Sequence, residues 1–119
     1  MADDSEVTET YKDGTLMARG ARSDGHRNGV WTYWYRNGQK KAFGRLIDDQ
    51  FEADWTWWRE NGELLQQGPF VNGQQHGRWR RYHPNGQLMD EGDWVHGKRS
   101  GEWTWYDPDG NVIRTKTFR

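Results

Sequence analysis

The chain has 119 residues, enough for one small domain or one short repeat array. It contains no cysteine, which excludes disulfide scaffolds, cysteine-ligated zinc sites and thiol nucleophiles. The formal net charge of −1 gives no global electrostatic reason to bind nucleic acid or an anionic membrane.

The composition contains two opposing signals. Hydrophobic residues make up only 32% and the mean hydropathy is −1.29, values typical of disorder. Aromatic residues reach 15%, however, with nine tryptophans, which favours a thin structure that buries rings without a thick aliphatic core. No apolar run approaches the roughly 20 residues of a membrane span, and no secretory leader is visible, so we expect a cytoplasmic protein.

Residues 1–6 contain Asp3, Asp4 and Glu6 and no cation, and predict a mobile acidic tail. From residue 7 onward the chain repeats every 24 residues, and all fifteen glycines fall into four phases of that repeat. The sets are Gly14, Gly38, Gly62, Gly86, Gly110; Gly20, Gly44, Gly68, Gly92; Gly25, Gly73, Gly97, with Asp49 in the open slot; and Gly29, Gly77, Gly101, with Ala53 in the open slot. The repeat domain 7–119 thus divides into a degenerate first unit 7–30, then 31–54, 55–78, 79–102 and a terminal unit 103–119.

Each unit predicts a β-hairpin. Asn-Gly at 37–38, 61–62 and 85–86 and Asp-Gly at 109–110 are typical of type I′ turns. A short aromatic strand such as 31–35 precedes the turn, a longer mixed strand such as 87–94 follows it, and a glycine-rich connection such as 95–101 leads onward. The predicted fold class is all-β, an elongated single-layer antiparallel meander of about ten strands.

A two-residue turn also fixes which residues face each other. Around Asn85-Gly86 it places Arg81 opposite Asp90, Arg80 opposite Glu91, and Arg78 opposite Asp93. It also sets Trp31 opposite Gly44, Trp55 opposite Gly68, and Trp79 opposite Gly92, where the missing side chain leaves room for an indole ring. The residues expected to be structural are therefore Trp31, Trp55, Trp79, Trp103, Gly38, Gly44, Gly62, Gly68, Gly86, Gly92 and Gly110.

The end of the chain departs from the repeat. Lys116 occupies the glycine slot of the last strand, and Phe118 falls in phase with Phe70 and Trp94. Together with Arg114 and Arg119, Lys116 predicts a charged strand that protects the edge of the sheet.

The repeating pattern is Trp-x-x-Tyr/Trp-x-x-Asn-Gly, a glycine six residues later, and then Asn-Gly-x-x-His-Gly-x-Trp, clearest at residues 71–79. Over residues 7–119 it resembles the MORN repeat, in particular its bacterial variant. The resemblance implies a non-catalytic scaffold for protein contacts, in some cases for phospholipid headgroups; proteins of the bacterial, YwqK-like type are described as antitoxins of toxin–antitoxin pairs. The unit 35–58 departs from the pattern at Asp49 and Ala53, beside Phe51, and predicts a reshaped or bulged connection.

Residues for catalysis or metal binding do not assemble in this pattern. None of the three serines lies in a Gly-x-Ser-x-Gly turn, and His26, His76, His83 and His96 fall in four different phases. Asp107-x-Asp109-Gly110 shares its phase with two hairpin turns, so it is interpreted as a turn rather than a calcium loop. We expect no catalytic residue, no cofactor and no metal site, and therefore no enzyme.

The aromatic columns are the remaining candidate site. Trp57 and Trp105 lie two residues after the repeating tryptophan, and Trp34, Trp58, Tyr82 and Tyr106 fall on the opposite face. One layer cannot cover all of them, so these six are the candidate partner-binding residues, with packing alone as the alternative.

The predicted function is a protein-binding module, for which an antitoxin or immunity protein is the specific hypothesis. The alternatives are a platform for carbohydrate or lipid headgroups and a structural scaffold that self-associates through its open edges. Single-stranded nucleic acid on Arg78, Arg80 and Arg81 is disfavoured, because each arginine has an acidic partner across the hairpin.

Overall fold

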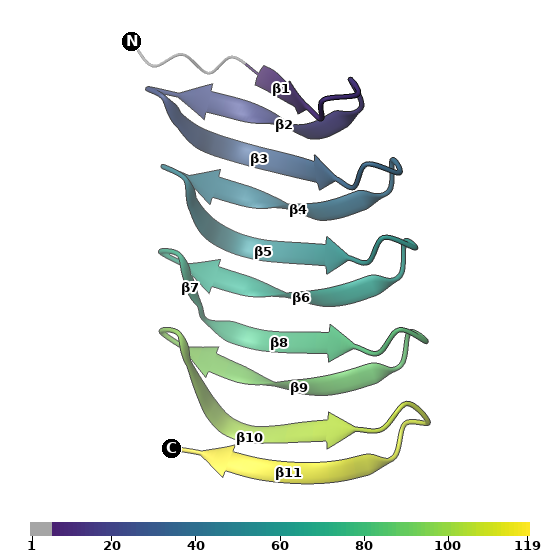
Figure 1. Ribbon diagram of the computed structural model, residues 1–119. Helices are drawn as coiled ribbons and strands as arrows, with labels where there is room; N and C mark the ends of the chain where they lie inside the picture. Colours follow the sequence, from purple (N-terminus) through teal and green to yellow (C-terminus); the bar gives the residue numbers. More distant parts are fainter. Residues whose placement is uncertain (1–5) are drawn as a thin grey trace.

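The computed structural model describes residues 6–119, which form one open antiparallel sheet (Figure 1). Its strands are β1 Glu6–Thr10, β2 Leu16–Ser23, β3 His26–Trp34, β4 Lys40–Ile47, β5 Gln50–Trp58, β6 Leu64–Val71, β7 Gln74–Gln75, β8 Gly77–Tyr82, β9 Leu88–Val95, β10 Lys98–Tyr106 and β11 Val112–Phe118. Strand order in space follows the sequence, with the short β7 pairing only β6. Overall extents of 49 × 32 × 15 Å agree with a single layer, so the predicted fold class is confirmed. No helix able to cross a membrane occurs in the part of the chain that is described.

The predicted acidic tail is wrong at its last residue. Glu6 begins β1, and its carboxylate pairs with the guanidinium of Arg19 at 2.8 Å. The rest of that predicted tail, residues 1–5, lies outside the described residues.

The Asn-Gly turns are not of type I′, which corrects the sequence-based prediction. At Asn85-Gly86 only the glycine has a positive φ, of 89°. The Gly86 N–H donates to the carbonyl of His83 at 2.9 Å, and the His83 N–H donates to the carbonyl of Gln87 at 2.7 Å. This pattern is a type I turn followed by a left-handed glycine, which introduces a bulge.

The predicted register nevertheless holds, because the ladder shifts by one residue between Arg81 and Tyr82 and compensates for the bulge. All three opposite-charge pairs of this hairpin are confirmed: Arg81–Asp90, Arg80–Glu91 at 3.0 Å, and Arg78–Asp93 at 3.7 Å.

The type I′ turns lie at the opposite end of the sheet. His96 and Gly97 have φ values of 47° and 82° and join the paired residues Val95 and Lys98. The equivalent pairs with two positive φ values are Asp24-Gly25, Asp48-Asp49 and Asn72-Gly73. The segments expected to be connections are therefore tight hairpins. The strands extend up to the two turn residues on either side, as Figure 1 shows.

The fourth glycine phase forms bulges. Gly29, Ala53, Gly77 and Gly101 all have positive φ values, between 59° and 116°. Asp49 and Ala53 adopt the left-handed conformation of their glycine counterparts, so the connection within 35–58 is bulged like the others and is not reshaped.

The irregular unit is the third, where β7 and β8 separate around His76. Pro69 lies on the neighbouring strand β6 and has no N–H to donate to the ladder, which accounts for the interruption.

Each repeating tryptophan lies across a glycine of the preceding strand. A Cβ atom on Gly68 would come within 2.2 Å of the Trp79 ring, and one on Gly44 within 2.3 Å of the Trp55 ring. The predicted pairing of Trp55 with Gly68 is confirmed, but the ring leans the other way, onto Gly44. The indole N–H groups of Trp31, Trp55, Trp79 and Trp103 donate to the carbonyls of Ala21, Arg45, Pro69 and Asp93, respectively, at 2.8–3.0 Å. These carbonyls lie beside the bulges, where the indole N–H groups supply donors to the backbone.

Among the described strands, the last one, β11, pairs only with β10. Its cations lie on aromatic rings: the Arg114 guanidinium is 4.9 Å from the Trp105 ring centroid, and the Lys116 ammonium is 4.8 Å from that of Phe118. Val112 and Ile113 of β11 are exposed. The strand is therefore charged, as predicted, and also carries apolar side chains in solvent.

Candidate functional site

One face of the sheet carries a nearly continuous array of rings, which we call the tryptophan face. It is defined by the buried residues Trp31, Trp55, Trp79 and Trp103. Between them lie the rings two residues further on. Trp57 has its ring centroid 5.6 Å from that of Trp55 and 5.9 Å from that of Trp79.

Within residues 6–119 no second layer covers the array, so its outer rings stay partly in solvent. Tyr33, Trp57 and Trp94 are half-buried and pack against the core, and Trp105 is half-buried beside Trp103. Phe51 is 37% exposed and packs edge-on against Trp55 and Trp57. Trp57 and Trp105 thus pack against the core and also expose part of their rings. They fit neither a purely packing role nor a freely exposed one.

The other four candidate residues lie on the opposite face, so the six do not form one site. Trp34, Trp58, Tyr82 and Tyr106 are each half-buried. Trp34 and Trp58 line a shallow groove with Gly38, Gln39, Lys40 and Gly62, with a volume of about 420 Å³.

A polar column next to these residues was missed from the sequence. Its side chains donate hydrogen bonds to the backbone carbonyl 23 residues later: Tyr11 to Trp34, Tyr35 to Trp58, Arg59 to Tyr82, and His83 to Tyr106. The signal was available, since Tyr11, Tyr35, Arg59 and His83 are spaced by 24. These bonds tie each hairpin to the next at the Asn-Gly end of the sheet.

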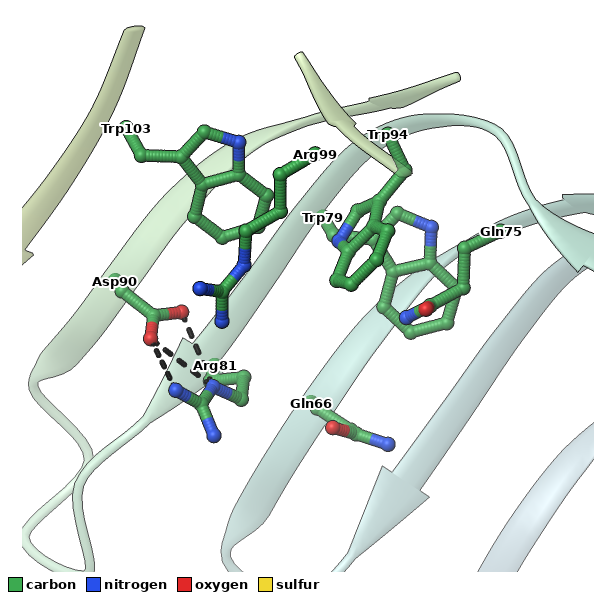
Figure 2. Close-up of a pocket in the computed structure, with 8 residues that line it drawn as sticks. All are labelled: Gln66, Gln75, Trp79, Arg81, Asp90, Trp94, Arg99 and Trp103. Carbon is green, nitrogen blue, oxygen red and sulfur yellow. Dashed lines mark hydrogen bonds and ion pairs between the residues drawn. The ribbon is translucent and has the colours of Figure 1, made fainter. Parts of the chain in front are cut away.

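The aromatic array is interrupted between Trp79 and Trp103, and a pocket of about 150 Å³ lies there (Figure 2). Its lining residues are Gln66, Gln75, Trp79, Arg81, Asp90, Trp94, Arg99 and Trp103. Arg81 stands where other units carry Tyr33, Trp57 and Trp105, and Asp90 stands in the phase of Ala18 and Ala42. Polar substitution in two columns at once therefore creates the pocket.

Asp90 is 1% exposed, and its charge is compensated by Arg81. Both carboxylate oxygens accept hydrogen bonds from the guanidinium: Oδ1 from Nε at 3.2 Å, and Oδ2 from Nε at 3.0 Å and from Nη2 (Figure 2). The hydrogen bond to Asp90 raises the pKa of Arg81 above its ordinary value. A buried carboxylate held in this way is a fixed anion, and Arg81 is a fixed cation with a side chain 46% exposed.

Arg99 forms the other wall of the pocket. Its guanidinium carbon lies 4.8 Å from the ring centroid of Trp103 and 5.6 Å from that of Trp94. Figure 2 shows the Arg99 side chain crossing the Trp103 ring, with its guanidinium directed toward the Arg81–Asp90 pair. Neither Arg99 nor Trp94 was among the candidate site residues, because the repeat pattern alone does not show which strand positions lie beside Arg81.

The histidines do not lie apart as their phases suggested. His76 and His96 have ring centroids 4.7 Å apart, and the His96 N–H donates to Nδ1 of His76 at 3.1 Å. The hydrogen bond and the charge of Asp49 raise the pKa of His26 above its ordinary value, at an exposed turn. Within residues 6–119 no group of three or more His, Asp or Glu side chains could hold a metal ion.

The repeat geometry agrees with the comparison to known families. The MORN repeat variant matches residues 27–42, 51–72, 75–96 and 99–119, and the chain belongs to this family. MORN repeats are in general non-enzymatic modules that bind proteins or membranes. The match is to the repeat itself and gives no support to the YwqK-like antitoxin branch in particular. No curated protein matches the chain.

Proposed function

We propose that the chain is a protein-binding module that covers its partner with the tryptophan face. The observation that carries this proposal is the array of half-buried rings on a sheet that no other described part of the chain covers. Tryptophan and tyrosine supply large contact area at low conformational cost, and such residues dominate the binding energy of protein interfaces. The stacked rings hold one another in place, so little order has to be gained on binding.

We further propose that the partner is a toxic protein which this chain neutralises by covering it. The resemblance to the bacterial repeat variant supports this role, since a rigid surface without catalytic groups can act by occlusion alone. Co-expression with the product of a neighbouring gene tests it: growth should be restored by the parent chain and not by a chain with an altered tryptophan face. Restored growth by both would contradict the proposal.

The tryptophan face itself is tested by comparing outer and inner rings. Trp57→Ala and Trp105→Ala should weaken partner binding by ~2 kcal/mol or more, because truncating a central aromatic anchor costs about that much. The inner substitutions Trp55→Ala and Trp103→Ala should lower stability more, because those rings are 1% and 2% exposed. Calorimetric affinities and melting temperatures of all four variants are the measurement. Affinity losses that simply follow the stability losses would show that the array is core.

A carbohydrate platform is the second candidate, favoured by the same half-buried rings of Trp57 and Trp105, whose flat faces suit sugar rings. A lipid headgroup is less favoured, because Glu9 and Asp90 compensate Arg27 and Arg81 and confine the other cations on its rings to one end, at Arg99, Arg114 and Lys116. Binding to a glycan array would favour the carbohydrate platform, and flotation with liposomes would favour lipid binding; neither is expected of a module that binds only protein.

A further inference from the structure

The pocket between Trp79 and Trp103 carries an excess positive charge. Asp90 compensates Arg81 with both of its oxygens, which leaves Arg99 as the remaining charge. Within the described chain, residues 6–119, no carboxylate lies within ion-pairing distance of Arg99. The pocket is therefore suited to one further anion.

Arg99 also has an unmet hydrogen-bonding group. Its Nε–H is buried and has no partner within the part of the chain described. Stacking on Trp103 and Trp94 satisfies the faces of the guanidinium but not its N–H edge, and the two terminal Nη groups, which make no hydrogen bond within residues 6–119, can donate to a carboxylate in a forked geometry. Buried polar groups without partners are rare in native proteins, and each calls for an explanation.

The same chain shows what this position binds when it is satisfied. Arg27 shares the repeat phase of Arg99 and likewise stacks on its tryptophan, Trp31, at 4.6 Å. There Nη2 donates to both oxygens of Glu9, at 3.0 and 2.9 Å, and Nη1 donates to the Tyr33 hydroxyl at 2.8 Å. The residue in the phase of Glu9 that faces Arg99 is Arg81, which is occupied with Asp90. A stacked arginine at this position thus holds a carboxylate in one unit and lacks it in the other.

The size and lining of the pocket suit an acidic side chain. A volume of about 150 Å³ lies well below the roughly 300–1,000 Å³ of ordinary small-molecule sites and suits a single side chain. The indoles of Trp79 and Trp94 offer apolar walls for a methylene stem. The side-chain amides of Gln66 and Gln75 line the same space and make no hydrogen bond within residues 6–119, so they can donate to a carboxylate oxygen.

From these observations we infer that the pocket beside Arg99 binds the carboxylate of an aspartate or glutamate side chain that a partner protein presents to the tryptophan face. The inference rests on the proposed function and adds the chemistry of the contact. An acidic residue of the partner is the anchor; its carboxylate binds Arg99, and its methylene groups pack against tryptophan rings.

A titration of the whole protein tests it with a blocked peptide, acetyl-Gly-Glu-Gly-amide, followed through the Arg99 Nε–H and Trp94 indole resonances in nitrogen-15 NMR spectra. We expect both signals to shift saturably. The matched peptide with glutamine should bind at least tenfold more weakly, and free glutarate several-fold more weakly, because it lacks the backbone that lies over the rings.

The variants supply the controls. Arg99→Gln should weaken peptide binding at least tenfold, and Arg99→Lys, which keeps the charge but loses the fork, should fall between. Arg27→Gln removes an equally stacked arginine whose carboxylate is internal, and should change the affinity less than twofold. Equal binding of the two peptides, equal binding of glutarate, or unchanged binding by Arg99→Gln would each overturn the inference. A partner that needs Trp57 but tolerates Arg99→Gln would also overturn it and leave the proposed function standing.

Discussion

At the scale of single residues, the glycines of the second phase determine where each indole lies. Gly68 shows this most clearly, because the Trp79 ring occupies the space that a side chain would take. Gly68→Leu should therefore displace Trp79 and lower the free energy of unfolding by about 3 kcal/mol, as overpacking does in a well-packed core. Gln67→Leu, one residue earlier and facing the other side, should cost less. Denaturant unfolding gives both values, and the indole N–H resonance of Trp79, not Trp55, should move.

The Arg81–Asp90 pair can be exchanged for the apolar combination that another unit uses. Arg81→Trp alone leaves Asp90 buried without its cation and should cost about 3 kcal/mol. Adding Asp90→Ala places an aromatic residue opposite an alanine, as in the pair of Tyr33 with Ala42, and should recover most of that loss. The free energies of unfolding of both single variants and the double variant measure the coupling. Additive effects would show that the two side chains do not depend on each other.

The sequence was enough to predict both members of this pair and their contact, because the alternation of side chains was correct and the bulge at the turn is compensated by a one-residue shift of the ladder. It was not enough to show that Asp90 is buried or that Arg99 borders it. Those facts depend on bulges at positions such as Gly101, which shift the ladder between β9 and β10. The prediction of which glycine the Trp55 ring covers was wrong for a similar reason. Gly44 and Gly68 both face Trp55, and the side-chain rotamer decides between them.

At the scale of elements, the bulge in β5 has an unusual residue. Ala53 has a φ of 59°, whereas its counterparts Gly29, Gly77 and Gly101 have no side chain to strain. A left-handed conformation costs an ordinary residue roughly 1–2 kcal/mol, and glycine gives back part of this through the flexibility of the unfolded chain. Ala53→Gly should thus stabilise the protein by about 0.5–1 kcal/mol in denaturant unfolding.

The matched control is Ala42→Gly in the neighbouring strand β4. Ala42 is buried, at 5% exposure, and its φ is not positive, so removing its methyl group should destabilise. If both substitutions destabilised the protein, the strain at Ala53 would have to be balanced by contacts of its methyl group.

The turns show how a correct register can follow from a wrong turn type. Asn-Gly favours type I′ when two residues join the strands, but here the tight turns fall at the other end, for example at His96-Gly97. Nothing in the dipeptide Asn85-Gly86 distinguishes a two-residue turn from a type I turn with a bulge. The hydrogen bond from the Asn85 side-chain amide to the Pro108 carbonyl of the next hairpin is one contact that a single hairpin does not reveal.

At the scale of the whole molecule, the backbone pairing within residues 6–119 joins each strand to the strands next to it along the sequence, apart from β6 with β8 past the short β7, as in other repeat arrays. Stability is then approximately a sum over adjacent hairpins, and one complete repeat can be removed while the backbone register of the remaining strands is kept. Deleting residues 44–67 joins Phe43 to Gly68, which takes the place of Gly44 opposite Trp31. We expect this 95-residue chain (119 minus 24) to unfold cooperatively, at a lower temperature than the parent.

Deleting residues 44–66 instead, one residue fewer, places Gln67 in the glycine slot opposite Trp31. The alternation of side chains then inverts along the joined strand, and a repeating tryptophan loses the glycine against which its ring packs. The melting temperature of the chain lacking residues 44–66 should fall at least ~10 °C below that of the 24-residue deletion. This difference corresponds to about 2 kcal/mol for a domain of this size. Thermal unfolding followed by near-ultraviolet circular dichroism of the tryptophans compares the two directly. Equal melting temperatures would mean that the 24-residue spacing does not determine the packing, and that the sheet tolerates slippage at the joined strand.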